Sequence, residues 1–208
     1  MERNPQIAGG HPPALLVVIS GPSGVGKDSV LQRLQERGVT FHFVVTATSR
    51  PIRPAEQDGR DYHFVSRARF EELIADDELI EWAEVYGHYK GVPKFEIRQA
   101  LASGRDVVLR LDVQGAASVR QIAPEALLIF IAPGSHAELR DRIVGRQTEG
   151  DAEIAIRLAA AEREMACVDA FDYLVINRDD QLDQTVDQIT AIVLAEKQRV
   201  FPRRPTID

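Results

Sequence analysis

The stretch "ALLVVISGPSGVGKDSV", residues 14–30, decides the fold. Residues 14–20 are almost all apolar, which predicts a strand buried within a parallel sheet. Gly21, Gly26 and Lys27 then satisfy the spacing G-x-x-x-x-G-K, with a further glycine at Gly24, and residues 27–38 have a helical pattern. Such a loop turns its N–H groups toward a phosphate, the helix N-terminus adds partial positive charge, and the lysine reaches the outer phosphates. The stretch therefore predicts a phosphate-binding loop.

The residue after the loop lysine departs from this motif. A hydroxyl residue commonly stands there and ligates Mg²⁺, but this chain has Asp28. A carboxylate could hold Mg²⁺ through water, although it also repels phosphates. The role of Asp28 is therefore open at this point.

Composition and charge exclude several classes of protein. The 208 residues are 27% charged and 44% hydrophobic, which is typical of a globular chain with one sizeable core or two small ones. The longest apolar runs are too short to span a bilayer, and a net charge of −7 argues against a nucleic-acid surface. Cys167 is the single cysteine and fits a reducing compartment. We therefore expect a cytoplasmic protein without nucleic-acid or membrane partners.

Strand and helix patterns alternate along the chain. This alternation predicts an α/β fold with a mostly parallel sheet flanked by helices, and the phosphate loop makes it a P-loop NTPase fold. A last helix would carry Leu182, Val186, Ile189 and Val193 on one face. Further strands are expected at 41–47, 105–113, 126–132 and 171–177, and further helices at 66–78, 95–103, 135–146 and 151–166.

Two stretches interrupt this alternation. Residues 46–94 are rich in Gly, Pro, Tyr and charge and predict an inserted subdomain, and the arginines of residues 133–160 predict a mobile cover. Residues 1–13 lack the apolar core of a secretory signal, so we expect a flexible leader. We expect one domain at 14–200, with its core at 14–45, 95–132 and 161–200, and a loose tail at 201–208.

From Val17 to about Ile192 the chain resembles the guanylate kinases. The resemblance rests on five motifs in order: GPSGVGK, TATSRPIRPAEQDGRDYHFVS, LIEWAEVYGHYKGVPK, LRLDVQGAASVR and FDYLVIN. Asp28 and the strings YKG and LRLDVQGA are more similar to the plastid-type branch and to similar bacterial enzymes than to the commonest pattern.

The resemblance implies a nucleoside monophosphate kinase of purine nucleotide metabolism. Such an enzyme transfers the γ-phosphoryl group of ATP to GMP with Mg²⁺ and gives ADP and GDP. ATP and GMP would be its small-molecule partners, with dGMP as a further candidate acceptor. The resemblance also implies that residues 46–94 bind GMP and that residues 133–160 form a lid. It does not indicate an oligomeric state.

Two arginines and a tyrosine are candidates for binding the acceptor phosphate. Arg50 and Arg53 lie three positions apart around a proline, and a guanidinium group can grip a phosphate through two parallel hydrogen bonds. The resemblance assigns both arginines, together with Tyr62, to the GMP phosphate. Without it, two solvated loop arginines would also explain these residues.

Glu81 is the candidate for base recognition. It follows the apolar pair Leu79 and Ile80, and a carboxylate there can accept hydrogen bonds from the guanine N1–H and amino group together. Adenine presents no such donor pair and would leave the carboxylate unpaired. The resemblance assigns this role to Glu81 and places Thr46 and Asp112 near the base. A surface carboxylate is the plainer alternative.

The string GHYKGVPK departs from the more frequent family pattern GNYYGTPK. Lys90 stands where a tyrosine would contact the phosphate, and a cation should serve a phosphate at least as well. Gly91 follows and belongs to the same GMP-binding string. Val92 replaces a hydroxyl residue that contacts guanine, which removes one hydrogen bond, worth about 1 kcal/mol. We therefore expect GMP binding with slightly weaker guanine selection.

The resemblance places ATP on the phosphate loop and brings arginines to it from the lid. Because the transition state of phosphoryl transfer is loose, positioning and positive charge supply most of the catalysis. The expected catalytic residues are Lys27, Arg50, Arg142, Arg146 and Arg157, although the last three could be solvated helix arginines. The expected ATP-binding residues are Gly21, Pro22, Ser23, Gly24, Val25, Gly26, Lys27, Asp28, Ser29 and, at the end of a strand, Asn177.

The string VVLRLD holds another departure. Arg110 stands where the common family pattern has an acidic residue, so the chain loses a carboxylate here and gains one at Asp28. Arg110 and Asp112 are two positions apart and are expected to point to one face of a strand. One hypothesis is that the two changes compensate, with Asp28 near the Mg²⁺ water shell. The other is a simple ion pair of Arg110 with Asp112 or Asp28.

Two other functions compete with this interpretation. Ribose 1,5-bisphosphate phosphokinases share a GKDS loop and a similar fold, but Glu81, Arg50 and Arg53 suit GMP. Non-catalytic guanylate-kinase-like binding modules typically have degraded phosphate loops, whereas Lys27 and the loop glycines are present here. Both remain alternatives to the kinase.

Overall fold

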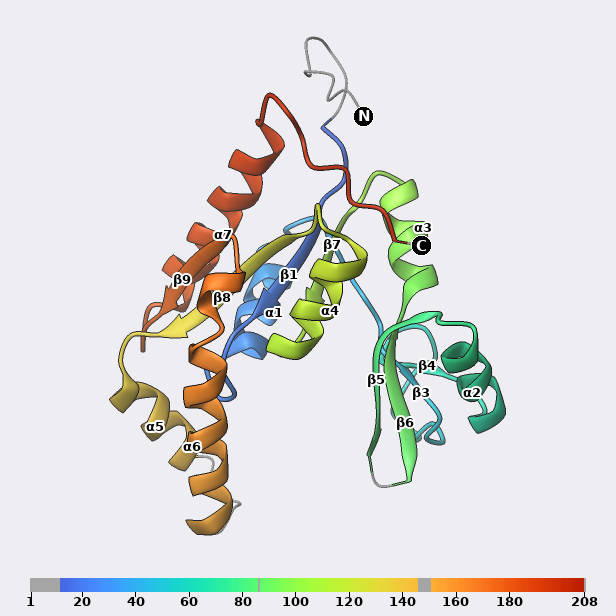
Figure 1. The fold of residues 1–208 in the computed structure, drawn as a ribbon, viewed down its shortest axis with the longest axis horizontal. Coiled ribbons are helices and arrows are strands. Elements are labelled where there is room, and N and C mark those ends of the chain that lie inside the picture. The colour runs from blue at the N-terminus through green and yellow to red at the C-terminus, as the bar shows by residue number, and fades with distance from the viewer. Residues whose placement is uncertain (1–11, 86, 146–150, 208) are drawn as a thin grey trace.

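The larger of two sheets is built from five parallel strands in the order β2-β7-β1-β8-β9 (Figure 1). The structure is a computed structural model and describes residues 12–85, 87–145 and 151–207. All five strands point the same way, so their carboxyl ends share one edge, and the glycine-rich loop leaves β1 at that edge. This confirms the predicted α/β class with a mostly parallel sheet. The strands are β1 (Leu16–Ser20), β2 (Phe41–Phe43), β7 (Asp106–Arg110), β8 (Leu127–Pro133) and β9 (Tyr173–Asn177).

Helices cover both faces of this sheet. Val17 and Ile19 of β1 pack with α1 (Lys27–Glu36) and α7 (Leu182–Lys197), whereas Leu16 and Val18 face α3 (Lys94–Ala102) and α4 (Val113–Ile122). Successive side chains of a strand point to opposite faces, so a strand covered on both sides is apolar throughout. The expected face of α7 is confirmed, since Val186, Ile189 and Val193 are buried and Leu182 is partly buried.

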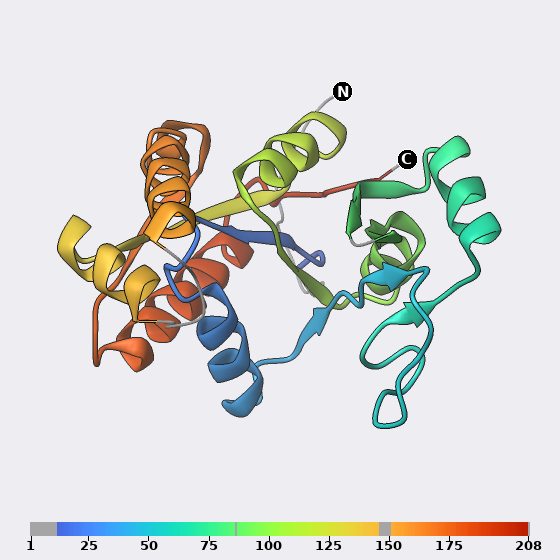
Figure 2. The same cartoon turned by 90° about the horizontal axis from the view of Figure 1, so that it is seen from below.

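A second sheet of four strands, in the order β4-β3-β6-β5, lies beside the first (Figure 2). The strand predicted at residues 41–47 is divided between the sheets, because β2 pairs with β7 and β3 pairs with β4 and β6. An apolar run shows that a segment is extended but not which sheet it joins. The second sheet consists of β3 (Ala47–Thr48), β4 (His63–Phe64), β5 (Leu79–Val85) and β6 (His88–Pro93), with α2 (Arg67–Ala75) packed against it.

Two further helices, α5 (His136–Val144) and α6 (Asp151–Met165), follow β8, and a short 3₁₀ turn spans Val168–Ala170. They pack on each other through Leu139, Ile143 and Ala161. Figure 1 shows this pair and the second sheet on opposite sides of the segment that joins β1 to α1. Within the described residues, no helix is both long and apolar enough to cross a bilayer.

The chain end is packed rather than loose, which corrects the expectation for residues 201–208 as far as residue 207. Ile207 is buried in the core on the α3–α4 face. The Arg203 guanidinium donates to the Glu196 carboxylate at 2.7 Å and to the Ala126 carbonyl at 3.0 Å. Figure 1 shows this segment running from α7 to the side of α3. Residues 1–11 of the expected leader lie outside the described part of the chain.

Candidate active site

The loop after β1 is held closely by the strands beside it. Gly21 has φ 142°, and a Cβ there would lie 2.1 Å from the Ile131 carbonyl oxygen, so only glycine fits. Gly26 has φ 98° and precedes α1, and a Cβ there would lie 2.8 Å from Asn177 Nδ2. That same amide donates to the Val25 carbonyl at 2.8 Å. The glycine spacing thus shapes a loop that fits between β8 and the end of β9.

Lys27 folds back over this loop. Its ammonium group donates to the Gly21 carbonyl at 2.5 Å and to the Pro22 carbonyl at 3.2 Å. Burial lowers the pKa of Lys27, and the nearby carboxylate of Glu164 acts in the opposite direction. The cation therefore sits partly desolvated at the carboxyl edge of the larger sheet.

Asp28 and Arg110 form an ion pair across this edge. Arg110 Nη1 lies 2.7 Å from Asp28 Oδ1, and both side chains are largely exposed. The expectation that Arg110 and Asp112 share one face of a strand is wrong, because β7 ends at Arg110 and Asp112 caps α4 by accepting from the Gly115 N–H at 2.7 Å. Of the two pairs considered from the sequence, Arg110–Asp28 is the one that forms.

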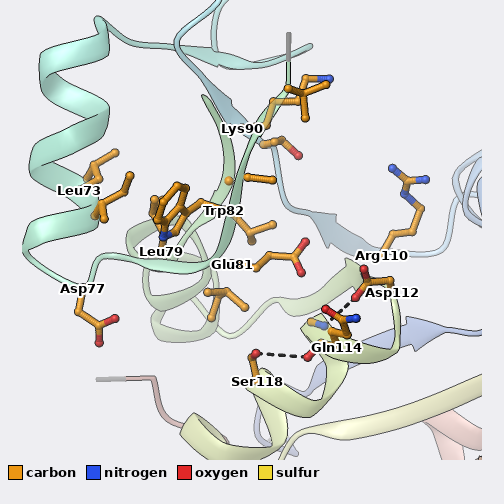
Figure 3. Close-up of a pocket in the computed structure, with 18 of the residues that line it drawn as sticks. Leu73, Asp77, Leu79, Glu81, Trp82, Lys90, Arg110, Asp112, Gln114 and Ser118 are labelled. Atoms are coloured by element: carbon orange, nitrogen blue, oxygen red, sulfur yellow. Dashed lines mark hydrogen bonds between the residues drawn. The ribbon is translucent and has the colours of Figure 1, made fainter. Parts of the chain in front are cut away.

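A cavity of about 690 Å³ lies between the second sheet and α4. Figure 3 shows the Glu81 carboxylate pointing into it, toward Asp112 and Arg110. Trp82, Gln114 and Ser118, which the sequence did not single out, also contribute to its wall. The structure therefore brings together six of the eight residues expected to bind GMP: Thr46, Tyr62, Glu81, Lys90, Gly91 and Asp112.

The environment of Glu81 opposes its ionisation. Burial raises the pKa of Glu81, the charge of Asp112 raises it further, and Arg110 partly offsets both. Gly115 allows the carboxylate to approach α4, since a Cβ there would lie 2.1 Å from Glu81 Oε2. Gly115 was missed because nothing in the sequence indicates how close β5 and α4 come.

The segment that carries Arg50 and Arg53, called the arginine arm below, lies beside this cavity and is held by a carboxylate of the same segment. Arg50 donates from both terminal nitrogens to Glu56, at 3.0 and 2.7 Å, and the Arg53 N–H donates to the same carboxylate at 2.8 Å. The hydrogen bonds from Arg50 lower the pKa of Glu56 most. The arginines therefore meet at Glu56, a residue that the sequence did not reveal.

Tyr62 joins the arginine arm to the cavity. The Arg50 guanidinium lies 5.4 Å from the centroid of the Tyr62 ring, and the Lys90 ammonium lies 5.2 Å from it. Lys90 Nζ is also 3.5 Å from the tyrosine hydroxyl. Two cations and a phenol are therefore grouped where the second sheet meets the segment at residues 49–62.

Arg142 lies against the loop on the side of α5. Its guanidinium donates to the Val25 carbonyl at 3.0 Å, to the Asn177 carbonyl at 2.9 Å and to the Asp179 carboxylate at 2.6 Å. Arg157 lies on α6, and Arg146 lies outside the described residues. The structure thus places Arg142 beside Asn177, as part of the wall that supports the loop.

The loop also contacts α6. The Ser23 N–H donates to the Glu164 carboxylate at 2.7 Å. Asp28 and Ser29 are exposed in the first turn of α1. The site thus has three parts: a glycine-rich loop with a lysine at the carboxyl edge of a parallel sheet, a second sheet that borders a cavity with charged side chains, and a flanking helix pair. Together they define the class as an α/β protein of P-loop-like architecture.

Comparisons with known proteins agree with this class. The family model for guanylate kinase matches residues 14–196. The chain is 48% identical to guanylate kinase 2, chloroplastic/mitochondrial, of Oryza sativa subsp. japonica, over 94% of this chain and 69% of that protein. It is 47% identical to the guanylate kinase of Bacillus subtilis, over 91% of this chain and 94% of that protein.

A comparison with solved structures points to the same family. The crystal structure of guanylate kinase from Anaplasma phagocytophilum matches with a TM-score of 0.66 and 32% identity, covering 90% of this chain and 88% of that one. The chain belongs to the guanylate kinase family.

Proposed function

We infer that the protein is a kinase that transfers the γ-phosphoryl group of ATP to GMP and releases ADP and GDP. The observation that carries this inference is the Glu81 carboxylate, which points into a cavity that also contains Thr46, Lys90 and Asp112. Its two oxygens suit the paired donors of guanine, and adenine would leave them unpaired. Family membership supports the same reaction.

The GMP phosphate is proposed to bind the group formed by Arg50, Tyr62 and Lys90, with Arg53 beside it. The closeness of both cations to the Tyr62 ring supports this proposal. Thr46, Gly91 and Asp112 line the same cavity and are proposed to lie near the base.

ATP is proposed to bind the loop of residues 21–29, with Lys27 on its phosphates and Asn177 near its adenine. The positive φ values of Gly21, Gly24 and Gly26 and the burial of Asn177 support a preformed loop. Arg142, Arg146 and Arg157 are proposed to contact the transferring group. For Arg142 this role requires that a phosphoryl oxygen replaces one of its present acceptors, such as the Asp179 carboxylate.

We further propose a division into three parts. Residues 14–45, 95–132 and 161–200 would form the core, residues 46–94 the GMP-binding subdomain and residues 133–160 the lid. The separate second sheet and the separate packing of α5 on α6 support this division. Closure of the outer parts over the core would bring the two substrates together and exclude water.

Mg²⁺ is the proposed cofactor. Mg²⁺ is commonly held by one or two carboxylates, substrate phosphates and waters rather than by an all-protein cage. The exposed Asp28 carboxylate beside Lys27 fits that pattern. Asp28 would hold the ion through water, and the ion would neutralise charge on the ATP phosphates.

The Arg110–Asp28 pair leaves two interpretations of these residues. In one, Asp28 replaces the carboxylate missing at position 110, so the two departures compensate. In the other, the pair is a structural ion pair. A double-mutant cycle on Asp28→Ser and Arg110→Asp separates them: compensation predicts that the double variant recovers turnover lost in the single variants, whereas additive losses would contradict it.

The reaction is tested by coupled ADP release with ATP and Mg²⁺, offering GMP, dGMP, AMP, UMP, CMP and ribose 1,5-bisphosphate separately. We expect turnover with GMP and little with AMP, and loss of this preference in Glu81→Gln. Turnover with the ribose bisphosphate alone would support the phosphokinase, and GMP binding without turnover would support a binding module. Neither alternative is favoured by the family assignment.

The setting of this reaction is also a proposal. We propose that the enzyme acts in purine nucleotide metabolism in the cytoplasm, with small molecules rather than nucleic acid or membranes as its partners. The acidic net charge of −7 supports the exclusion of nucleic acid.

A further inference from the structure

A carboxylate from α6 is bonded to the backbone of the phosphate loop. The Ser23 N–H donates to Glu164 Oε2 at 2.7 Å, although the two residues are 141 positions apart in sequence. Both residues are half-buried. A backbone N–H that donates to a carboxylate forms one of the stronger types of protein hydrogen bond. Glu164 therefore satisfies one donor of the loop.

Helix α5 contacts the same loop at the next two residues. A Cβ on Gly24 would lie 2.8 Å from Ile143 Cγ1, so α5 packs directly against its Cα. Arg142 donates to the Val25 carbonyl at 3.0 Å. Ile143 in turn packs against Ala161 of α6. Three consecutive loop residues are thus supported by one pair of packed helices.

The position of Glu164 on α6 links this support to a second part of the site. Arg157 precedes Glu164 by seven residues, which is close to two helical turns, so the two side chains leave the helix on nearly the same face and about 10 Å apart along its axis. The bond at Glu164, together with the packing of α5 on both the loop and α6, therefore limits how α6 can shift or rotate relative to the loop, and with it the place of Arg157.

We infer that Glu164 is a positioning residue that ties the phosphate loop to α6. It holds the loop in shape for the ATP phosphates and sets the approach of the helix that carries Arg157. Glu164 itself contacts neither substrate. This inference rests on the proposed function, because it assumes that ATP binds the loop and that Arg157 serves the transferring group.

The test compares Glu164→Leu and Glu164→Gln with a matched control, Glu162→Gln, whose side chain is exposed on the same helix. Leucine removes the acceptor, and we expect the Kd for ATP, measured by calorimetry without GMP, to rise about tenfold. The turnover at saturating substrates should also fall, because Arg157 is displaced, while the Kd for GMP stays unchanged. Glutamine keeps an acceptor oxygen and should restore ATP affinity to within about twofold of the original.

Three results would overturn the inference. Unchanged ATP affinity and turnover in Glu164→Leu would show that the bond is dispensable. Tighter ATP binding would show that the carboxylate competes with the nucleotide, and equal weakening of ATP and GMP would show general damage. Urea unfolding checks that each variant is folded. If the unmodified protein fails to phosphorylate GMP, the proposed function fails while the ATP-binding comparison still tests the loop contact.

Discussion

At the scale of single residues, the chemistry of Glu81 depends strongly on its surroundings. In the proposed role, its carboxylate must be ionised to accept two hydrogen bonds from guanine. Burial and the charge of Asp112 both favour the protonated form, so the pKa of Glu81 is raised. We therefore expect the proposed guanine recognition to be sensitive to mild acid.

We expect the KM for GMP to rise on acidification at a pH above the ordinary titration range of a glutamate. The direction follows because GMP would bind to the deprotonated form of Glu81. A raised pKa means that this form is lost at a higher pH than for an ordinary glutamate. The KM for ATP, measured over the same range, serves as the control. In Asp112→Asn the loss of the neighbouring charge should move the rise in the KM for GMP to lower pH. A rise at an unchanged pH would contradict the assignment of this titration to Glu81 beside Asp112.

The residues that could be predicted from sequence are those with a local chemical signature. Lys27 follows a fixed glycine spacing, and Glu81 lies within an apolar strand. Glu56 and Glu164 could not be predicted, because nothing in the sequence shows that Glu56 accepts from the Arg50 side chain and the Arg53 N–H, or that Glu164 accepts from a loop N–H 141 positions away. The chain has 32 acidic residues, so composition alone could not single them out.

At the scale of elements, α3 connects the two sheets through a single buried carboxylate. Glu96 accepts from His42 of β2 at 2.8 Å, from His63 of β4 at 2.8 Å and from the Val45 N–H at 3.0 Å. Val45 lies in the segment where the chain crosses from one sheet to the other. The junction between core and second sheet therefore combines this shared acceptor with the packing of Ile80 and Val92 in the core on the α3–α4 face.

Replacement of this acceptor should loosen the junction. We expect Glu96→Leu to lower the free energy of unfolding by about 2–4 kcal/mol, because several partly buried donors lose their acceptor together. Urea denaturation measures the loss. The control is Glu71→Leu on α2, an exposed residue paired with Arg67, where the change should stay within about 0.5 kcal/mol. Equal effects of the two substitutions would contradict the role of Glu96.

Periodicity predicted the strands of the larger sheet and the described α-helices except α4, but not the strands β4, β5 and β6 of the second sheet. Two of the differences have clear physical causes. The helix α4 was missed because VQGAASVRQI contains glycine and β-branched residues, and it is stabilised by the Asp112 cap and by the burial of Ala116 and Val119. The division of residues 41–47 was missed because strand propensity does not specify a partner strand.

At the scale of the whole molecule, residues 201–207 pack against the core and are tied to α7. Glu196 of α7 is 3% exposed and accepts from the Tyr173 hydroxyl and from Arg203, each at 2.7 Å. Burial would raise the pKa of Glu196, but the hydrogen bonds from Arg203 and Tyr173 outweigh it and leave the pKa lowered. Arg203 therefore connects residues 201–207 to α7.

Arg203→Ala should lower the free energy of unfolding at neutral pH by about 2–4 kcal/mol, because a buried carboxylate loses its main cationic partner. Since the folded pKa of Glu196 is lowered, its contribution is present above the unfolded pKa and is lost as pH falls through the folded one. The difference in the free energy of unfolding between the variant and the original protein should therefore become smaller in acid. The matched control is Arg204→Ala, whose side chain is exposed; a loss as large as that of Arg203→Ala would refute the assignment.

The bidentate contact between Arg50 and Glu56 means that any anion that binds the arginine arm must first displace a carboxylate. The arginine is already neutralised by a tethered anion, whose effective local concentration is high. If the GMP phosphate binds where we propose, a doubly charged phosphate that also reaches Lys90 and Tyr62 would compete with that carboxylate better than a monovalent anion such as chloride. The arginine arm would thus select anions by their charge, independently of the recognition of the base by Glu81.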